Sequence, residues 1–228
     1  MDTYCEKGEG NMKYLAYVFD FDYTLGDSTE GIEKCINYGL LRLGYPALST
    51  DEVRPLVGLS LKETYKRAAK DDDEEKAAQF EAYFKEKADE VMTASTQYLP
   101  YAKEVLEKIH GMGIRTGIVT TKYGRRIREI MKKCGGTDLI DVIIGGDDVD
   151  RPKPDPEGLL RMADLLNVSK EKILYIGDSI VDARTAEQAR IDFAGVTTGA
   201  TSEEELSEYP HVAVYQDIRG LDEFLEVR

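Results

Sequence analysis

Hydrophobic and polar positions alternate between two kinds of segment along most of the chain. Six short apolar runs predict buried strands, at residues 14–19 (YLAYVF), 115–120 (RTGIVT), 141–144 (DVII), 172–176 (KILYI), 192–196 and 211–214 (HVAV). Helical patterns separate or follow the later runs, at residues 102–111, 125–134, 156–166, 181–189 and the C-terminus. Strands that alternate with helices predict an α/β fold, a doubly wound parallel sheet with helices on both faces.

The segment from residue 28 to residue 98 has a different pattern. Apolar residues recur at helical spacing from Ile32 to Leu43, and Gly44 ends that helix. Residues 61–69 and 74–94 also have helical patterns, with Ser60 as a candidate N-cap, and we predict no strand in the segment. We therefore expect a split α/β core, residues 1–26 and 99–228, that carries an inserted all-α cap domain at residues 27–98.

Charge and hydrophobicity limit the possible partners. The 228 residues are 42% hydrophobic, enough for a sizeable core, and 30 lysines and arginines against 44 acids give a net charge of −14. This balance argues against nucleic acid and anionic membranes as partners, because binding to both depends on Lys and Arg. A small anionic substrate remains possible, since one site can differ in sign from the whole chain.

The cysteines and the apolar runs indicate the compartment. Cys5, Cys35 and Cys134 are odd in number and widely spaced, so no disulfide framework or metal spacing is predicted. No apolar run approaches the ~20 residues of a membrane span, and the N-terminus lacks the pattern of a signal peptide. We expect a cytoplasmic protein.

Polar residues follow four of the predicted strands at or just beyond their carboxyl ends. They are Asp20 and Asp22, Thr120 and Thr121, Lys153 between two prolines, and Asp178 with Asp182 one helical turn beyond. Parallel sheets bind ligands at this edge. We therefore expect these side chains to converge on one site.

The residue types suit phosphoryl transfer. Asp20 and Asp178 can hold Mg²⁺, an ion that prefers oxygen ligands, with the backbone carbonyl of Asp22 as a third ligand. Asp20 is then a candidate nucleophile, because carboxylates form aspartyl-phosphates, and Asp22 can protonate the leaving oxygen. Thr120 and Lys153 can hold the phosphoryl oxygens.

The set of motifs resembles the haloacid dehalogenase-like superfamily in its Mg²⁺-dependent phosphatase branch. DFDYT at residues 20–24 resembles the nucleophile motif, and Thr120 in IVT, Lys153 in RPKPDP and GDSIVD at 177–182 resemble the other three. The resemblance implies a helical cap domain in the place of the insert.

The resemblance also implies residue roles. Asp20 is the nucleophile and Asp22 the general acid and base, while Asp20, Asp22 and Asp178 form the Mg²⁺ site. Thr120, Thr121 and Lys153 bind the substrate phosphate. Thr24 supports the loop through a backbone hydrogen bond, and Asp182 orients Lys153 or the waters of the metal.

Within the superfamily the chain is most similar to phosphoglycolate phosphatase-like proteins, with two departures. Tyr23 stands where this branch usually has glycine, so its side chain alters the turn or contacts the cap. Ile32 stands where the related hexose-phosphate mutases carry a histidine, which favours hydrolysis. The expected function is Mg²⁺-dependent hydrolysis of a small phosphorylated metabolite, a phosphoglycolate-like molecule or a sugar phosphate.

Three alternatives stay open at this stage. They are a β-phosphoglucomutase-like phosphomutase, a phospho-acceptor signalling domain that stores an aspartyl-phosphate, and a binding protein without activity. The sequence specifies neither the exact substrate nor whether the protein is a monomer or a dimer.

Overall fold

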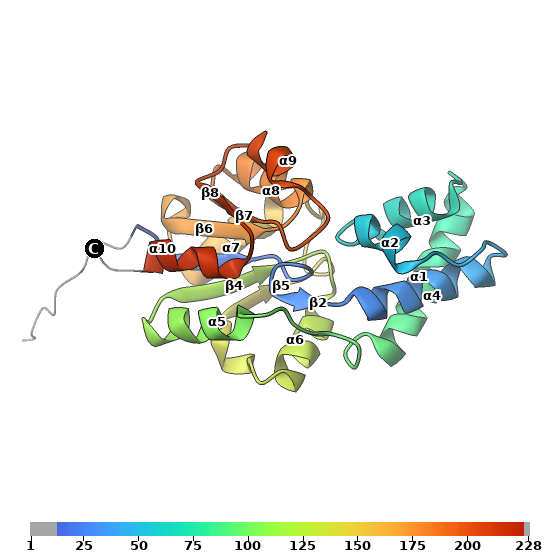
Figure 1. Ribbon diagram of the computed structural model, residues 1–228, viewed down its shortest axis with the longest axis horizontal. Coiled ribbons are helices and arrows are strands. Elements are labelled where there is room, and N and C mark those ends of the chain that lie inside the picture. The colour runs from blue at the N-terminus through green and yellow to red at the C-terminus, as the bar shows by residue number, and fades with distance from the viewer. Residues whose placement is uncertain (1–12, 226–228) are drawn as a thin grey trace, which may run out of the picture.

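A six-stranded parallel sheet forms the centre of the protein, seen here in a computed structural model that describes residues 13–225 (Figure 1). The strand order is β5-β4-β1-β6-β7-β8. The bounds are Ala16–Phe19 (β1), Arg115–Val119 (β4), Val142–Ile144 (β5), Ile173–Gly177 (β6), Asp192–Val196 (β7) and Ala213–Tyr215 (β8). β1 lies between β4 and β6, with Phe19 opposite both Ile118 and Ile176. The predicted sheet is confirmed.

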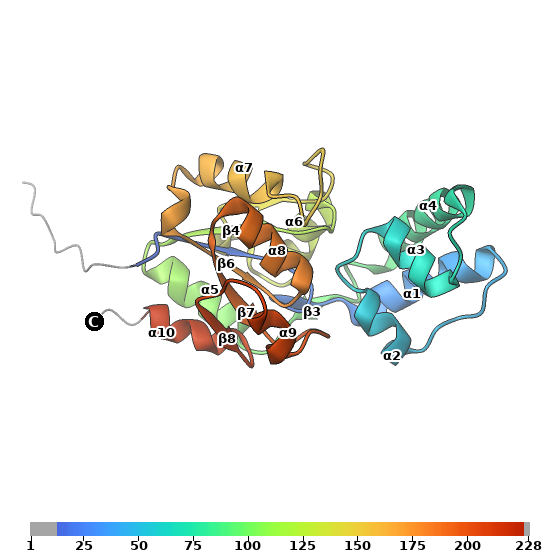
Figure 2. The ribbon, with the colours of Figure 1, turned by 90° about the horizontal axis from the view of Figure 1, so that it is seen from above.

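Helices cover both faces of this sheet (Figure 2). Alternate residues of β1 point to opposite sides, so Tyr17 and Phe19 join one hydrophobic core while Ala16 and Val18 join the other. One face is covered by α5 (Ala102–Gly111), α6 (Gly124–Lys133), the 3₁₀ turn Ile218–Leu221 and α10 (Asp222–Leu225). The other is covered by α7 (Glu157–Leu166), α8 (Ile180–Ala189) and α9 (Glu203–Ser207). The sheet is therefore doubly wound, as predicted.

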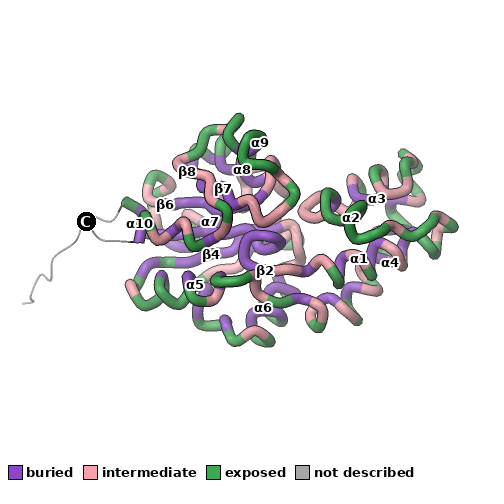
Figure 3. The backbone as a smooth tube through the Cα atoms, in the orientation of Figure 1, coloured by how far each residue is buried: buried purple, intermediate pink, exposed green. Residues whose placement is uncertain are grey.

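The insert between β1 and β4 is a bundle of helices with its own core. Its helices are α1 (Thr29–Arg42), α2 (Thr50–Val53), α3 (Leu61–Ala69) and α4 (Glu74–Val91), with a 3₁₀ turn at Arg54–Leu56. Ser60 caps α3 as predicted, because its side chain accepts a hydrogen bond from the Glu63 amide. Figures 1 and 2 both place the bundle beyond one end of the sheet, and Figure 3 shows that buried residues line the interior of both parts.

One prediction about the insert is wrong. Gln97–Tyr98 form a strand, β3, which pairs antiparallel with β2 (Gly26–Asp27). A strand of two residues is too short to show a period in the sequence, and it exists only because β2 lies beside it. Both predicted domain boundaries fall in this ribbon, and we propose it as the junction between core and cap.

Among the described residues, Cys35 and Cys134 are free thiols, whereas Cys5 lies outside residues 13–225. Within the same range, no helix combines the length and the apolar character needed to cross a bilayer.

Candidate active site

Three neighbouring strands bring polar side chains to one edge of the sheet. Asp20 follows β1, Thr120 follows β4 and Asp178 follows β6, and all three are buried. Asp182 lies in the first turn of α8. Carboxylate oxygens of Asp20, Asp178 and Asp182 lie within 4.8 Å of one another. The convergence predicted from the strand ends is observed.

Lys153 joins this group from a more distant strand. It lies in the loop after β5, which is separated from β1 by β4. Its ammonium donates hydrogen bonds to Oδ1 of Asp20 at 2.8 Å and to Oδ1 of Asp182 at 2.7 Å. The loop from β5 to α7 therefore reaches past β4 and fixes a positive charge beside Asp20.

Asp182 is held on both of its oxygens. Oδ2 accepts from the Ser179 hydroxyl at 2.5 Å in a capping box at the start of α8, and Oδ1 accepts from the Tyr175 hydroxyl at 2.8 Å. Gly177 permits this approach, since a Cβ there would lie 2.4 Å from that of Asp182. Asp182 thus orients Lys153. Sequence reasoning missed Tyr175, although it is the one residue with a polar tip among the last four positions of the run KILYI.

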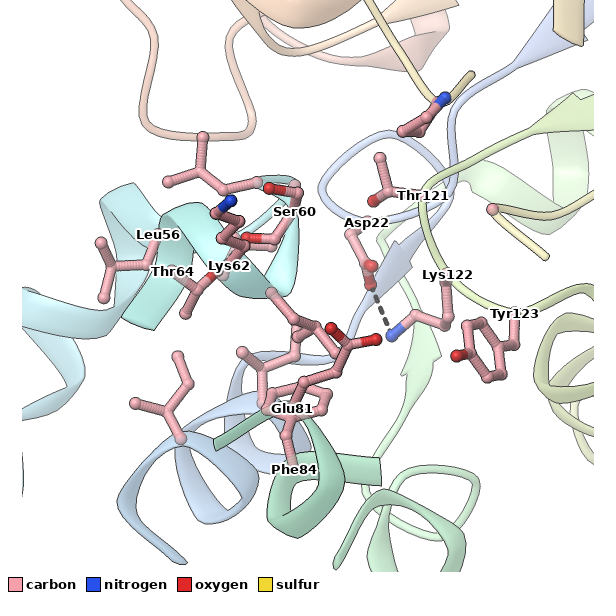
Figure 4. A pocket seen from close by; sticks show the side chains of 18 of the residues that line it. Asp22, Leu56, Ser60, Lys62, Thr64, Glu81, Phe84, Thr121, Lys122 and Tyr123 are labelled. Atoms are coloured by element: carbon pink, nitrogen blue, oxygen red, sulfur yellow. Dashed lines mark hydrogen bonds and ion pairs between the residues drawn. The ribbon is translucent and has the colours of Figure 1, made fainter. Parts of the chain in front are cut away.

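Asp22 faces a lysine that the sequence did not single out. Nζ of Lys122 lies 3.2 Å from Oδ1 of Asp22, and both side chains are buried (Figure 4). Oδ1 has no hydrogen-bond partner among the described residues, so the contact is an ion pair without hydrogen-bond alignment. The sequence could have indicated Lys122 as a site residue, because it directly follows Thr120 and Thr121 at a strand end.

Burial controls the charge of the central groups. It raises the pKa of Asp20 to about 6, although the charge of Lys153 acts in the opposite direction. Burial also raises the pKa of Asp178 above its ordinary value, and the charges of Asp182 and Asp20 add to the effect. For Lys153 burial acts to lower the pKa, but the carboxylates of Asp182 and Asp20 outweigh it and raise the pKa.

The donor set fits a divalent cation. At this edge the carboxylates of Asp20, Asp22, Asp178 and Asp182 face the ammonium groups of Lys122 and Lys153. Four carboxylates thus face two ammonium groups. The two negative charges left over are the number that one Mg²⁺ would balance. Within residues 13–225 the side-chain hydrogen bonds to Asp20 and Asp178 come from Lys153 and Thr24 alone. Oxygens of both carboxylates therefore remain available to a metal.

The predicted supporting threonines lie around the same edge. The Thr24 amide donates to the Phe21 carbonyl at 3.3 Å, a backbone hydrogen bond within the loop, and its hydroxyl also donates to Oδ1 of Asp178 at 3.3 Å. Oγ1 of Thr120 accepts from the Lys122 amide at 3.3 Å. Thr121 lines the cavity in front of Asp22 (Figure 4).

Tyr23 has a left-handed backbone, with φ of 60°. This conformation favours glycine, which gives a physical reason for the residue that is usual there. The Tyr23 hydroxyl lies 2.9 Å from the Thr29 hydroxyl in α1, and its ring lies 5.6 Å from the Arg54 guanidinium of the cap. Of the two predicted consequences of this substitution, contact with the cap is observed.

A cavity of about 250 Å³ lies between the sheet edge and the insert (Figure 4). On the core side it is lined by Asp22, Thr121, Lys122, Arg126 and Lys153. On the cap side the wall is mainly apolar and includes Ile32, Ile36, Leu56, Leu59 and Phe84. The predicted cap loop around Gly58 and Ser60 also contributes. The acidic edge therefore opens onto a small cavity between core and cap.

Comparison with known proteins shows a family and relatives whose names describe hydrolases and phosphatases. Residues 17–196 match the family model described as haloacid dehalogenase-like hydrolase. A phosphoglycolate phosphatase of Cereibacter sphaeroides is 36% identical over 186 residues, which cover 80% of this chain and 84% of that protein. One from Psychrobacter arcticus is 28% identical over 221 residues, 91% of this chain and 94% of that protein.

A solved structure from Bacteroides fragilis, described as a haloacid dehalogenase-like hydrolase, superimposes with a TM-score of 0.88 at 40% identity, covering 92% of this chain and 100% of that one. The family match spans most of the chain, from β1 to β7, and includes every predicted site residue. The chain therefore belongs to the haloacid dehalogenase-like hydrolases and is a phosphatase of that family.

Proposed function

We propose that the protein is a Mg²⁺-dependent phosphatase that hydrolyses a small phosphomonoester through an aspartyl-phosphate on Asp20. The observation that carries the proposal is the buried carboxylate of Asp20, held by Lys153 at 2.8 Å, at a sheet edge that opens into the cavity. Mg²⁺ would be held by the carboxylates of Asp20 and Asp178 and the carbonyl of Asp22. When bound, it neutralises charge on the phosphoryl group.

The residues divide the reaction into two displacements. A carboxylate oxygen of Asp20 forms a bond to phosphorus while the bond from phosphorus to the ester oxygen breaks, and Asp22 gives that oxygen a proton. Asp22 then takes a proton from water as the water oxygen bonds to phosphorus and the bond to Asp20 breaks. Lys153 and Thr120 stabilise the charge on the phosphoryl oxygens in both steps.

The size and walls of the cavity support a small substrate. About 250 Å³ holds a phosphate with a short organic group, and the cap forms one wall of the cavity. The relatives named as phosphoglycolate phosphatases support a phosphoglycolate-like molecule. Ile32, which lines the cavity, gives no group for proton transfer at the position of the mutase histidine. The cytoplasmic location stays a prediction.

The test is phosphate release from a panel of phosphomonoesters, with Mg²⁺ and with EDTA. We expect turnover of at least one small ester with Mg²⁺ and its loss in EDTA. Turnover that is unaffected by EDTA would exclude the metal role. A long-lived phosphoprotein without repeated turnover would instead indicate a signalling domain.

A further inference from the structure

We propose that Lys122 and Arg126 form an anion subsite in the cavity, which selects phosphomonoesters whose leaving group carries a carboxylate close to the ester oxygen. Both are specificity-determining residues that the motif set does not include. The inference rests on the proposed phosphatase function and adds the residues that would choose its substrate.

Lys122 is a buried cation with unused hydrogen-bonding capacity. Its side chain is 7% exposed, and an ammonium group has three donors. Within the described residues, its Nζ contacts the Asp22 carboxylate at 3.2 Å without hydrogen-bond alignment and the Met92 sulfur at 3.4 Å. A thioether is a weak acceptor. Apart from the Asp22 carboxylate, the ammonium therefore lacks a strong acceptor among the described residues.

Arg126 adds a second donor to the same cavity. It lies one helical turn after Lys122 at the start of α6, and it is 4% exposed. Its Nη2 donates to the carbonyl of Lys85 at 3.1 Å and to Asp89 at 2.6 Å. Its Nε is buried and has no partner among the described residues. A buried donor without a partner is unfavourable, so this atom calls for an acceptor that the protein does not supply.

Two other cations of the cavity, Lys62 and Lys85, are paired with carboxylates that take no part in the proposed chemistry, and Lys153 is the lysine that binds the phosphoryl group in that chemistry. Lys62 pairs with Glu74 at 2.5 Å, and Lys85 pairs with Glu81. Lys122 differs because its partner, Asp22, must turn to the leaving oxygen in the proposed reaction. An anion on the leaving group would replace Asp22 beside Lys122 and keep this buried charge paired.

Distances limit where that anion can lie on the substrate. A general acid contacts its oxygen at about 3 Å, and Lys122 lies 3.2 Å from Asp22, so the ammonium lies within roughly 6 Å of the leaving oxygen. A carboxylate one carbon away from the ester oxygen bridges this gap. The predicted class is therefore the phosphate esters of short 2-hydroxy acids.

The experiment compares two esters of nearly equal size with Mg²⁺ present, 2-phosphoglycolate and ethyl phosphate, which differ in the carboxylate. The wild type is expected to have the higher kcat/KM for 2-phosphoglycolate. Lys122→Met should lower the ratio of kcat/KM for 2-phosphoglycolate to kcat/KM for ethyl phosphate roughly 10- to 100-fold, the usual value of a charged hydrogen bond. Lys122→Arg, which keeps the charge, should restore part of the preference.

A matched pair of variants separates the effect of the Arg126 cation from the effect of its ion pair with Asp89 of the cap. Arg126→Gln removes the subsite cation and the contact with Asp89, whereas Asp89→Asn weakens the same contact and leaves the cation in place. Only Arg126→Gln should lower the preference for 2-phosphoglycolate. Lys62→Met, a change at another cation of the cavity, should leave the ratio unchanged.

Each outcome decides between the proposals, once thermal melting has shown that the variants are folded. An unchanged ratio in Lys122→Met and Arg126→Gln overturns the subsite, and so does an equal loss with both esters, which indicates a structural role. A wild type that hydrolyses the ester panel but does not prefer 2-phosphoglycolate to ethyl phosphate also overturns it, while the phosphatase function stands. Absence of all turnover with Mg²⁺ refutes the proposed function itself.

Discussion

The sheet edge and the cap wall meet at one cavity but are built in different ways. The edge consists of buried polar side chains that are held by hydrogen bonds to other side chains, and each follows a strand of the sheet. They are Asp20, Asp178 and Lys153. The wall is mainly apolar and takes its side chains from α1, the turn at Arg54–Leu56, the start of α3 and α4. We infer that the strand ends carry the proposed chemistry and the edge side carries the proposed anion subsite, while the apolar wall limits the shape of the leaving group. The wall and the edge can then be changed separately.

The sharpest test of this division removes the nucleophile. Asp20→Asn should reduce kcat by at least about 10³-fold for every ester, because no other group can form the bond to phosphorus. Phosphate release and thermal melting measure activity and folding. Asp150→Asn, a change in an exposed loop residue, is the control. Turnover by folded Asp20→Asn at the wild-type rate would contradict the mechanism.

Removal of the buried lysine should also have a large effect, here on stability. Lys153→Met leaves Asp20 and Asp182 without their shared cation, and loss of one partner of a buried pair lowers the free energy of unfolding by about 3–5 kcal/mol. Urea unfolding of the metal-free protein measures the change. Lys132→Met alters an exposed lysine and should have almost no effect. A loss of under ~1 kcal/mol in Lys153→Met would show that the pair is weak.

The acidic edge should also couple metal binding to pH. The pKa of Asp20 is raised to about 6, so its protonated form stabilises the metal-free protein below pH ~4, and this stability is lost as the pH rises through about 6. Mg²⁺ requires the ionised form, so its affinity should be at least ~10-fold weaker at pH 5 than at pH 7. Mg²⁺ titrations followed by thermal melting test this, and equal affinities at both values would contradict it.

A change in the cap wall should have the smallest effect and the most selective one. Leu59→Ala shortens a half-buried side chain of the wall, and such changes discriminate between leaving groups by about 10-fold. We expect altered ratios of kcat/KM among esters with an unchanged affinity for Mg²⁺. Leu165→Ala, at a residue of α7 that is 52% exposed, is the control. A loss of Mg²⁺ affinity in Leu59→Ala would show that wall and edge are not separable.

Local sequence patterns predicted the bounds of an element correctly where its own residues show a clear period. The helix at 102–111 and the strand at 192–196 have the predicted bounds, because each shows several residues of a clear period. The short helices at Thr50–Val53 and Glu203–Ser207 were not predicted, and neither was β3. These two short helices and this strand of two residues depend on capping groups and neighbours more than on their own pattern.

By itself, the sequence determined the parallel sheet, the helical insert and the meeting of Asp20, Asp178, Thr120 and Lys153, because the carboxyl ends of parallel strands lie at one edge. The tertiary structure alone decided the contact of Lys122 with Asp22, the unpartnered Nε of Arg126 and the contact of Tyr23 with Thr29 and Arg54 of the cap. The succession of strands and helices follows from local patterns along the chain. Contacts between side chains of separate helices and loops depend on how the parts pack, which no period in the chain encodes.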